Sequence, residues 1–375
     1  MVKIIHFHVK EKSNIGDVAI VLSLRDILKT KFKITSYTSK NIFDLKKRDY
    51  PWFIDILMKY FEILKFTSSI KLLDKNYRKI KNKLDDILLN KINKHDLMIL
   101  GGGGLYSKWF FPLNDELINK IKIPIIIFGV GYNHNFGDKN LSSKELKSII
   151  FLNRKAKLSS VRDLETKEFL KKLGFNADYI GDPAIFLKSK KINLKFEKNI
   201  KIALNIAQHG WKFQDKYTPQ LVDYYTELIK NLGRTYNAKF FYIRHHSNEN
   251  RVIKILKKRF PDMTICKYGP YETKYIYENM DLVISMMLHS SIFAFGSSVP
   301  VFNIAYDKKN HAFMRAINQE NSFIDVRNLN LENISSDLKI LSSLIKKKNN
   351  FLKIKKGFNK KTNEFVEKIR QITKK

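Results

Sequence analysis

Short apolar runs alternate along this chain with stretches in which apolar residues recur at helical spacing. Apolar runs rich in Val, Ile and Phe are typical of buried strands, and strands that alternate with helices are typical of parallel sheets. In the first half we predict strands at residues 2–8, 96–100, 124–128, 158–161 and 177–180. In the second half we predict strands at residues 200–206, 239–243, 263–267, 282–285 and 301–304. Helices are predicted between them, among others at residues 17–30, 54–66, 219–236 and 248–259.

A polar stretch, KSKKINLKFEKN at residues 188–199, separates the two strand-rich halves. Polar segments of this kind are typical of domain boundaries. We therefore predict an α/β protein with two Rossmann-like domains, at residues 1–190 and 199–349, that face each other across a cleft. A helical stretch at residues 350–375 is expected to cross back to the N-terminal domain. Ligands of such domains bind beyond the carboxyl ends of the strands.

Composition supports a folded protein with two cores. The chain has 375 residues, of which 44% are hydrophobic and 13% aromatic, and this is enough apolar material for two domains. Cys266 is the single cysteine, so no intramolecular disulfide forms and a reducing compartment is expected. The first residues lack the pattern of a signal peptide, and the longest apolar run, near residues 123–131, is too short to span a bilayer. We expect a cytoplasmic protein.

The formal net charge of +34 comes from 70 Lys and Arg against 36 Asp and Glu. A basic excess attracts nucleic acids or anionic lipids. Here the lysines are scattered along the whole chain, and no RNA-binding fingerprint, zinc-finger spacing or aromatic-and-basic platform is present. The sequence therefore favours a basic, solvated surface and no nucleic-acid partner. It leaves open a peripheral contact with an anionic membrane or a lipid-linked acceptor.

The segment SNIGDVAI, residues 13–20, follows the first predicted strand and opens a helix. Gly16 would allow the backbone to approach a ligand closely, and the amides at a helix start favour an anion. Asp17 fits either an N-cap of this helix or a catalytic carboxylate. The segment lacks both G-x-G-x-x-G and G-K-[ST], so neither a dinucleotide site nor a P-loop is predicted.

A run of four glycines follows a buried strand in DLMILGGGGLYS, residues 96–107. Gly101, Gly102, Gly103 and Gly104 lose more conformational entropy on folding than other residues would, without a side chain to pack in return. We expect their backbone amides to lie against a ligand or another chain segment.

Polar candidates also follow two further strands. Asn133 comes after the apolar run IIIFGVGY, and Arg162 lies in SVRD at the end of the next strand. An arginine offers a planar fork that suits carboxylate or phosphate. The alternative for Arg162 is a salt bridge to Asp163 or Asp182.

In the second half, YIRHHSNEN places Arg244 and His245 at the end of a strand. No acidic or cysteine partner lies at zinc-ligand spacing, so we predict no metal site and no cofactor. His289 lies where the strand at residues 282–285 gives way to a helix. A ring that titrates near neutral pH at this edge of the sheet is a candidate for proton transfer.

Taken in order, several segments resemble the polysaccharide pyruvyl transferase family. They are NIGDVAI, LMILGGGGLY, IFGVGYN, SVRDLETKEFLKKLG, YIGDPAIFL, YIRHHSNEN and DLVISMMLHSSIFAFGSSVPVFNIAYDKK. The resemblance implies a fold like that of GT-B glycosyltransferases, with the active site between the domains. It also implies transfer of the enolpyruvyl unit of phosphoenolpyruvate to a sugar of a cell-surface glycan, commonly with closure of a pyruvate ketal.

One residue departs from the family pattern. In family members the last segment usually reads Ser-x-Arg-Leu-His, and the arginine is expected to hold phosphoenolpyruvate. Ser285, Leu288 and His289 match this pattern, but Met287 stands in the arginine's place. A thioether cannot pair with an anion.

A pyruvyl transferase with this sequence needs another cation. Lys308 and Arg315 follow the next strand and so are candidates, with Arg162 and Arg244 as further ones. Two other functions stay open: a GT-B-like glycosyltransferase that uses a nucleotide sugar, and a non-catalytic member that binds a glycan.

Overall fold

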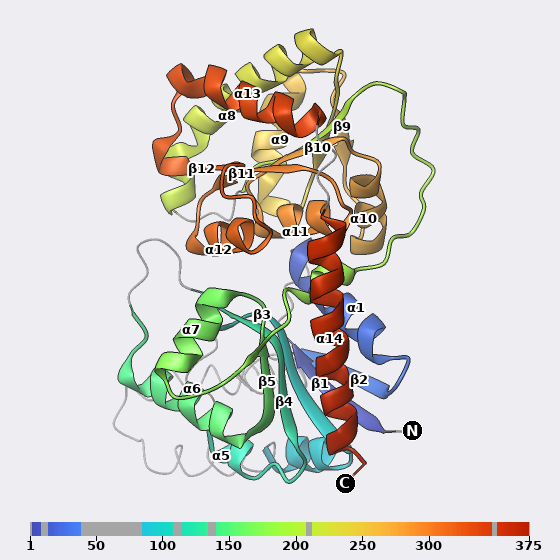
Figure 1. Cartoon of the computed structure of the whole chain (residues 1–375), viewed down its shortest axis with the longest axis vertical. Coiled ribbons are helices and arrows are strands. Elements are labelled where there is room, and N and C mark those ends of the chain that lie inside the picture. The colour runs from blue at the N-terminus through green and yellow to red at the C-terminus, as the bar shows by residue number, and fades with distance from the viewer. Residues whose placement is uncertain are drawn as a thin grey trace, which may run out of the picture.

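The computed structural model describes residues 2–8, 14–38, 85–107, 115–133, 140–207, 212–346 and 351–374. These residues form two α/β domains stacked along the long axis of the molecule, each built on a parallel six-stranded sheet (Figure 1). The predicted fold class of two Rossmann-like domains is confirmed. The described part of the chain has no helix that is both long and apolar enough to cross a membrane.

The N-terminal sheet has the strand order β2-β1-β3-β4-β5-β6. Its strands are β1 (Lys3–His8), β2 (Lys33–Thr38), β3 (Leu97–Tyr106), β4 (Ile125–Tyr132), β5 (Ala156–Val161) and β6 (Asp178–Tyr179). Its helices are α1 (Ile15–Leu28), α5 (Asp115–Asn119), α6 (Ser143–Lys155) and α7 (Leu164–Lys172). The sequence pattern missed β2, because KITSYT is mostly polar. The helix predicted at residues 54–66 lies outside the described residues.

The C-terminal sheet has the strand order β12-β11-β10-β7-β8-β9. Its strands are β7 (Lys201–Asn205), β8 (Lys239–Ile243), β9 (Thr264–Cys266), β10 (Leu282–Ser285), β11 (Val301–Ala305) and β12 (Phe323–Asp325). Its helices are α8 (Lys212–Tyr236), α9 (Asn250–Arg259), α10 (Pro270–Glu278), α11 (Leu288–Gly296), α12 (Lys308–Ala316) and α13 (Ile334–Lys346). β10 and β11 are buried along their whole length, as expected for strands that are covered on both faces.

One apolar cluster contains residues of both domains. Ile20 of α1 belongs to the same cluster as Phe293 and Phe295 of α11. Gly296, the last residue of α11, lies so close to the short helix η1 (Pro183–Phe186) that a Cβ there would be 2.5 Å from the carbonyl oxygen of Ile185. This packing joins α1 and η1 of the N-terminal domain to α11 of the C-terminal domain.

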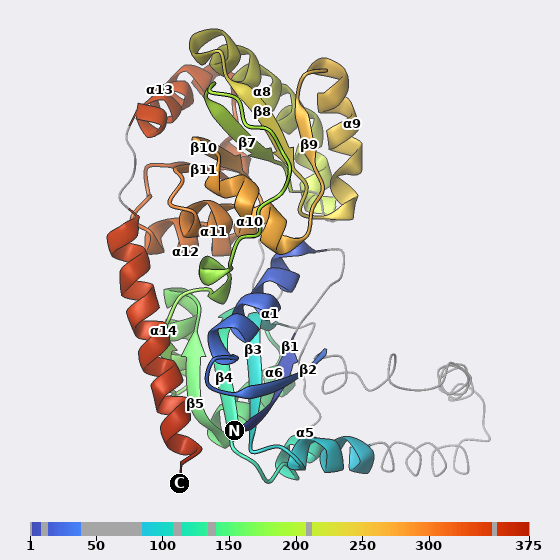
Figure 2. The ribbon, with the colours of Figure 1, turned by 90° about the vertical axis from the view of Figure 1, so that its right-hand side faces the viewer.

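Residues 187–200 connect η1 to β7 without helix or strand, and so they link the two sheets. The last helix, α14 (Leu352–Ile372), runs back along the N-terminal domain (Figures 1 and 2). Phe365 packs edge-on against Phe128 of β4, with ring centroids 5.2 Å apart. Lys368 Nζ lies 2.7 Å from Asp178 Oδ2 of β6. The end of the chain thus packs on the first domain.

In each sheet the strand order reverses at one place. The reversal lies between β1 and β3 in the N-terminal sheet and between β7 and β10 in the C-terminal sheet. Ligands of such sheets bind beyond the carboxyl ends of the strands at the reversal. Because α1 follows β1 and α11 follows β10, the starts of these two helices mark the expected ligand edges.

Candidate functional site

The starts of α1 and α11 touch each other at the junction between the domains. The backbone N–H of Ile15, the first residue of α1, donates to the carbonyl oxygen of His245 at 3.0 Å. Gly16 lies against His289, since a Cβ on Gly16 would be 2.1 Å from Nδ1 of that ring. The first turn of a helix carries N–H groups without intrahelical partners and a partial positive charge. At the start of α1 the N–H of Ile15 and that of Gly16, which donates to Asn14 Oδ1 at 3.0 Å, already have partners. It is therefore the partial positive charge of the two turns that favours an anionic ligand.

His289 is partly exposed and lies one residue inside the start of α11. Its Nε2 is shielded from solvent and has no hydrogen-bond partner among the described residues. Burial, followed by the nearby charges of Arg162 and Lys309, lowers the pKa of His289 to about 3. The ring is therefore neutral at pH 7 and can accept a proton.

Arg162 follows β5 and is buried. Its Nη1 lies 3.3 Å from Asp182 Oδ2 and its Nε lies 3.5 Å from Asp163 Oδ2. The salt bridge considered from the sequence is thus present, and the charge of Arg162 still acts on His289. Gly131 makes room for the guanidinium, because a Cβ there would be 2.2 Å from Arg162 Nε.

Lys309 is the second cation near His289, and the sequence reasoning missed it. Its Nζ lies 3.1 Å from Asp307 Oδ2 and 5.6 Å from the ring centroid of Tyr306. Burial alone would lower the pKa of Lys309, but Asp307 and Tyr306 outweigh it, so the pKa is raised above its ordinary value. Its charge also acts on Arg162. The sequence feature that could have indicated Lys309 is Asp307, two residues earlier, which caps the start of α12 and pairs with this lysine.

Lys308 and Arg315, which were predicted to replace the family's arginine, are exposed on α12. Their charges act on Glu165 of α7, across the domain junction. Burial, followed by Asp163, raises the pKa of Glu165, and these two cations counteract the rise. The structure therefore places both of them at the α7 side of the junction.

Arg244 and His245 leave the end of β8, as predicted, but they differ in surroundings. Arg244 is partly exposed and donates from Nη1 to Asn250 Oδ1 at 3.2 Å. His245 is buried, and its Nε2 lies 2.8 Å from the hydroxyl of Tyr277. Burial, followed by the charge of His289, lowers the pKa of His245 to about 3. His245 is therefore a neutral ring held inside the C-terminal domain beside the junction.

Ser285, Met287 and Leu288 are all buried. Ser285 Oγ lies 2.7 Å from Ser291 Oγ, so this hydroxyl serves a contact within the domain. Leu288 belongs to the apolar cluster shared by the two domains. The side chain of Met287, 3% exposed, packs in the other large apolar cluster of the C-terminal domain. The place of the family's arginine is thus apolar in this chain.

Three of the four consecutive glycines pack against α1. Gly101 lies against Leu24, and Gly102 and Gly103 lie against Ile20. Gly102 and Gly103 have φ values of 81° and 75°, a region that favours glycine. The packing partner that the sequence could not show is therefore a helix of the same domain.

The fourth glycine, Gly104, is partly exposed and lies under Asn133. A Cβ on Gly104 would be 2.8 Å from Cγ of Asn133. The Oδ1 atom of Asn133 is buried and has no hydrogen-bond partner among the described residues. Asp17 lies in the first turn of α1 and is partly exposed.

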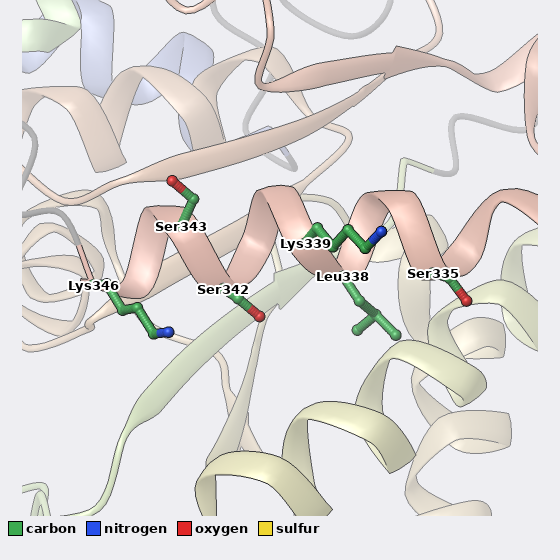
Figure 3. A pocket seen from close by; sticks show the side chains of 6 residues that line it. All are labelled: Ser335, Leu338, Lys339, Ser342, Ser343 and Lys346. Carbon is green, nitrogen blue, oxygen red and sulfur yellow. The ribbon is translucent and has the colours of Figure 1, made fainter.

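Two hollows on the described part of the surface are lined by other residues. One of about 430 Å³ runs along α13, lined by Ser335, Leu338, Lys339, Ser342, Ser343 and Lys346 (Figure 3). Another of about 530 Å³ lies between α7, β6 and α14, with Leu164, Tyr179 and Lys361 among its lining residues.

Solved structures with the same arrangement define the fold as GT-B. A putative UDP-N-acetylglucosamine 2-epimerase from Listeria monocytogenes is 11% identical with a TM-score of 0.63, over 98% of this chain and 96% of that one. The UDP-GlcNAc 2-epimerase from Neisseria meningitidis bound to UDP-GlcNAc is 14% identical with a TM-score of 0.57, over 98% and 100%. The S. aureus MnaA–UDP structure is 12% identical with a TM-score of 0.58, over 91% and 88%. At these identities the likeness shows the fold alone.

The family model of polysaccharide pyruvyl transferase matches residues 14–308. This chain therefore belongs to the polysaccharide pyruvyl transferase family, and the resemblance found in the sequence is confirmed. No curated protein matches the chain.

Proposed function

We propose that this chain transfers the enolpyruvyl unit of phosphoenolpyruvate to a sugar of a cell-surface glycan and closes a pyruvate ketal. The observation that carries the proposal is that the charges of Arg162 and Lys309 act on His289, whose ring lies where the starts of α1 and α11 touch. Phosphoenolpyruvate has a carboxylate and a phosphate. Guanidinium, ammonium and helix-start amides are the groups that bind such anions.

We assign the planar fork of Arg162 to the carboxylate and the ammonium of Lys309 to the phosphate. Asp182 and Asp163 hold the guanidinium from one side. Because Met287 is buried among apolar residues, these two cations replace the family's arginine in the proposed site.

His289 is assigned the proton transfers. A bound trianion offsets the charges of Arg162 and Lys309 and so raises the pKa of His289 from its low value. The ring then takes the proton of a sugar hydroxyl as that oxygen attacks C2 of phosphoenolpyruvate, and it delivers this proton to C3, which leaves the ring neutral again. A second hydroxyl of the sugar then displaces phosphate from C2. Its proton leaves with the phosphate, and the ketal is closed.

The acceptor sugar is proposed to lie on the N-terminal side of the junction. Asn133, whose Oδ1 accepts no hydrogen bond from the described residues, and the partly exposed Gly104 are the contacts we assign to its hydroxyls. Asp17, in the first turn of α1, is the second candidate for proton transfer. Gly16 contributes backbone at the same place.

A net charge of +34 also supports a location for the enzyme. We propose a cytoplasmic protein that lies at an anionic membrane surface, where a lipid-linked acceptor would be found. Sedimentation with vesicles tests this: binding to vesicles that contain an anionic lipid, lost in high salt, supports the proposal. Equal behaviour with neutral and anionic vesicles contradicts it.

Calorimetric titration with phosphoenolpyruvate tests the donor. We expect the wild-type protein to bind it and Lys309→Met to bind it at least about tenfold more weakly, since a desolvated charge pair is lost. Lys230→Met is the matched control, because Lys230 is an exposed lysine of α8 paired with Glu227. Absence of binding to the wild-type protein contradicts the proposal.

The alternative donor is a nucleotide sugar, favoured by solved structures of the same fold that hold UDP or UDP-GlcNAc. The same titration with UDP-GlcNAc separates the two. Binding of UDP-GlcNAc without phosphoenolpyruvate favours a glycosyltransferase. Binding of a glycan with neither donor favours a non-catalytic member.

A further inference from the structure

A buried carboxylate lies behind the site. Glu249 ends the short helix η2 (Ser247–Glu249), between β8 and α9, and its side chain is 0% exposed. Burial raises the pKa of Glu249, and the groups that donate hydrogen bonds to its oxygens counteract the rise and favour the carboxylate. A buried carboxyl group is costly for folding, and four donors surround this one.

Each oxygen of Glu249 accepts two hydrogen bonds. Oε1 accepts from the backbone N–H of His245, at 2.9 Å, and from that of His246. Oε2 accepts from Asn205 Nδ2 and from the hydroxyl of Tyr242, both at 3.0 Å. The carboxylate therefore ties the end of β8 to the end of β7.

Both of these strand ends continue directly to the site. The carbonyl oxygen of His245 accepts the N–H of Ile15, the first residue of α1. The Oδ1 of Asn205 accepts the N–H of Met287 at 3.1 Å, immediately before α11. Glu249 is thus connected to the start of α1 through His245 and to the start of α11 through Asn205. These two helix starts meet where Gly16 contacts His289.

This connection differs from an ordinary core contact in one respect. Two of the four partners of Glu249 use a second atom to hold a helix start: His245 holds α1 and Asn205 holds α11. Because both connections begin at Glu249, a shift of its carboxylate is expected to move the two helix starts relative to each other. Small displacements of reacting groups cost large factors in rate.

We propose that Glu249 is a positioning residue that sets His289 against the start of α1. It touches no substrate, and its effect passes through Asn205 and His245. The kinetic part of this proposal rests on the proposed pyruvyl transfer. The geometric part does not depend on it.

The test uses Glu249→Gln in the full chain. The amide is the same size, but its NH₂ group cannot accept a hydrogen bond, so one pair of donors loses its partner. We expect kcat to fall about 10- to 100-fold while KM changes less than about threefold, since the ligand groups remain in place. Asp337→Asn is the matched control. Asp337, on α13, is a buried carboxylate of the same domain, and it accepts a hydrogen bond from the hydroxyl of Tyr224 at 2.6 Å. This variant is expected to lose stability but to keep kcat and KM.

A second measurement needs no substrate. In protein with labelled histidine, the imidazole resonance of His289 is assigned by its loss in His289→Asn. We expect this resonance to shift in Glu249→Gln and to stay unchanged in Asp337→Asn. If Glu249→Gln does not fold, Tyr242→Phe removes one donor to the same carboxylate and is expected to shift the resonance by less.

The outcomes separate the two proposals. Loss of stability in Glu249→Gln with an unmoved His289 resonance overturns the positioning role, whatever the donor is. A resonance that shifts in Glu249→Gln, together with a wild-type chain that does not turn over phosphoenolpyruvate, supports the positioning role and contradicts pyruvyl transfer. An unmoved resonance in Tyr242→Phe also overturns the positioning role where Glu249→Gln fails to fold.

Discussion

The backbone of Gly16, in the N-terminal domain, lies directly against the ring of His289, in the C-terminal domain. A Cβ at position 16 would be 2.1 Å from Nδ1 and 2.2 Å from Cγ of that ring. Real side-chain atoms do not approach so closely, so glycine is required here for steric reasons and not for an unusual φ. The contact joins the two sheets at the places where their strand orders reverse.

Gly16→Ala should therefore reduce activity while the fold persists. The added methyl group displaces either the His289 ring or the start of α1, and a displacement of about 1 Å costs about 100-fold in rate. Steady-state kinetics and a melting curve provide the measurement. Gly357→Ala is the matched control, because a Cβ at that position of α14 would have no atom of the described residues within 4 Å. It should raise stability by about 0.5–1 kcal/mol and leave the rate unchanged.

His289→Ala should lower kcat about 100- to 10,000-fold, as expected when a group that transfers protons is lost. The melting temperature should change little, because the ring is partly exposed and its Nε2 makes no hydrogen bond within the described residues. His95→Ala serves as the control: His95 lies just before β3, at the opposite end of the N-terminal sheet's strands. A large loss of stability with a mild kinetic effect would show that His289 is structural.

Arg162→Gln should weaken phosphoenolpyruvate binding and also destabilise the protein by about 3 kcal/mol, because Asp182 is left buried without its partner. The double variant Arg162→Gln with Asp182→Asn should recover most of the stability but none of the binding. Urea unfolding and calorimetric titration measure the two effects. Recovery of binding in the double variant would contradict the assignment of Arg162 to the ligand.

Met287→Arg should destabilise the protein by about 3–5 kcal/mol, since it places an unpaired charge in an apolar cluster. Met287→Leu, which keeps the volume, should cost less than about 1.5 kcal/mol. Thermal unfolding of both variants, with titration of phosphoenolpyruvate, provides the measurement. If Met287→Arg is stable and binds phosphoenolpyruvate more tightly, the arginine has turned into the site as in other family members.

His245 and His289 should both remain neutral at pH 5, because burial lowers the pKa of each to about 3. An unfolded histidine has a pKa of about 6.5, so the unfolded chain binds more protons below that pH. Each of these rings therefore lowers the stability of the fold as pH falls from about 6.5 towards 3, by about 1.4 kcal/mol per pH unit. Histidine imidazole shifts recorded from pH 8 to pH 4 test this. Titration of either ring near pH 6.5 would contradict it.

The glycine run shows what a local pattern can and cannot indicate. The glycine run predicts a close approach of something to the backbone, and the structure shows this at Gly101 and Gly102. The run lies inside β3 and not after it as expected. The approaching group is Leu24 or Ile20 of α1. Sequence spacing does not reveal it, because the contact depends on how the helix crosses the sheet.

Lys308 and Lys309 are neighbours in the chain, and they show the same limit of what a sequence pattern can indicate. The sequence by itself determined the alternation of strands and helices, the order of the family segments and the expectation of a cation after β11, because these depend on local periodicity and residue type. Neighbouring helical residues point about 100° apart around the helix axis. Only the tertiary structure decided that Lys309, not Lys308, acts on Arg162 and His289. The reason is that the direction of a side chain decides which groups it lies near only once the other domain is packed against it.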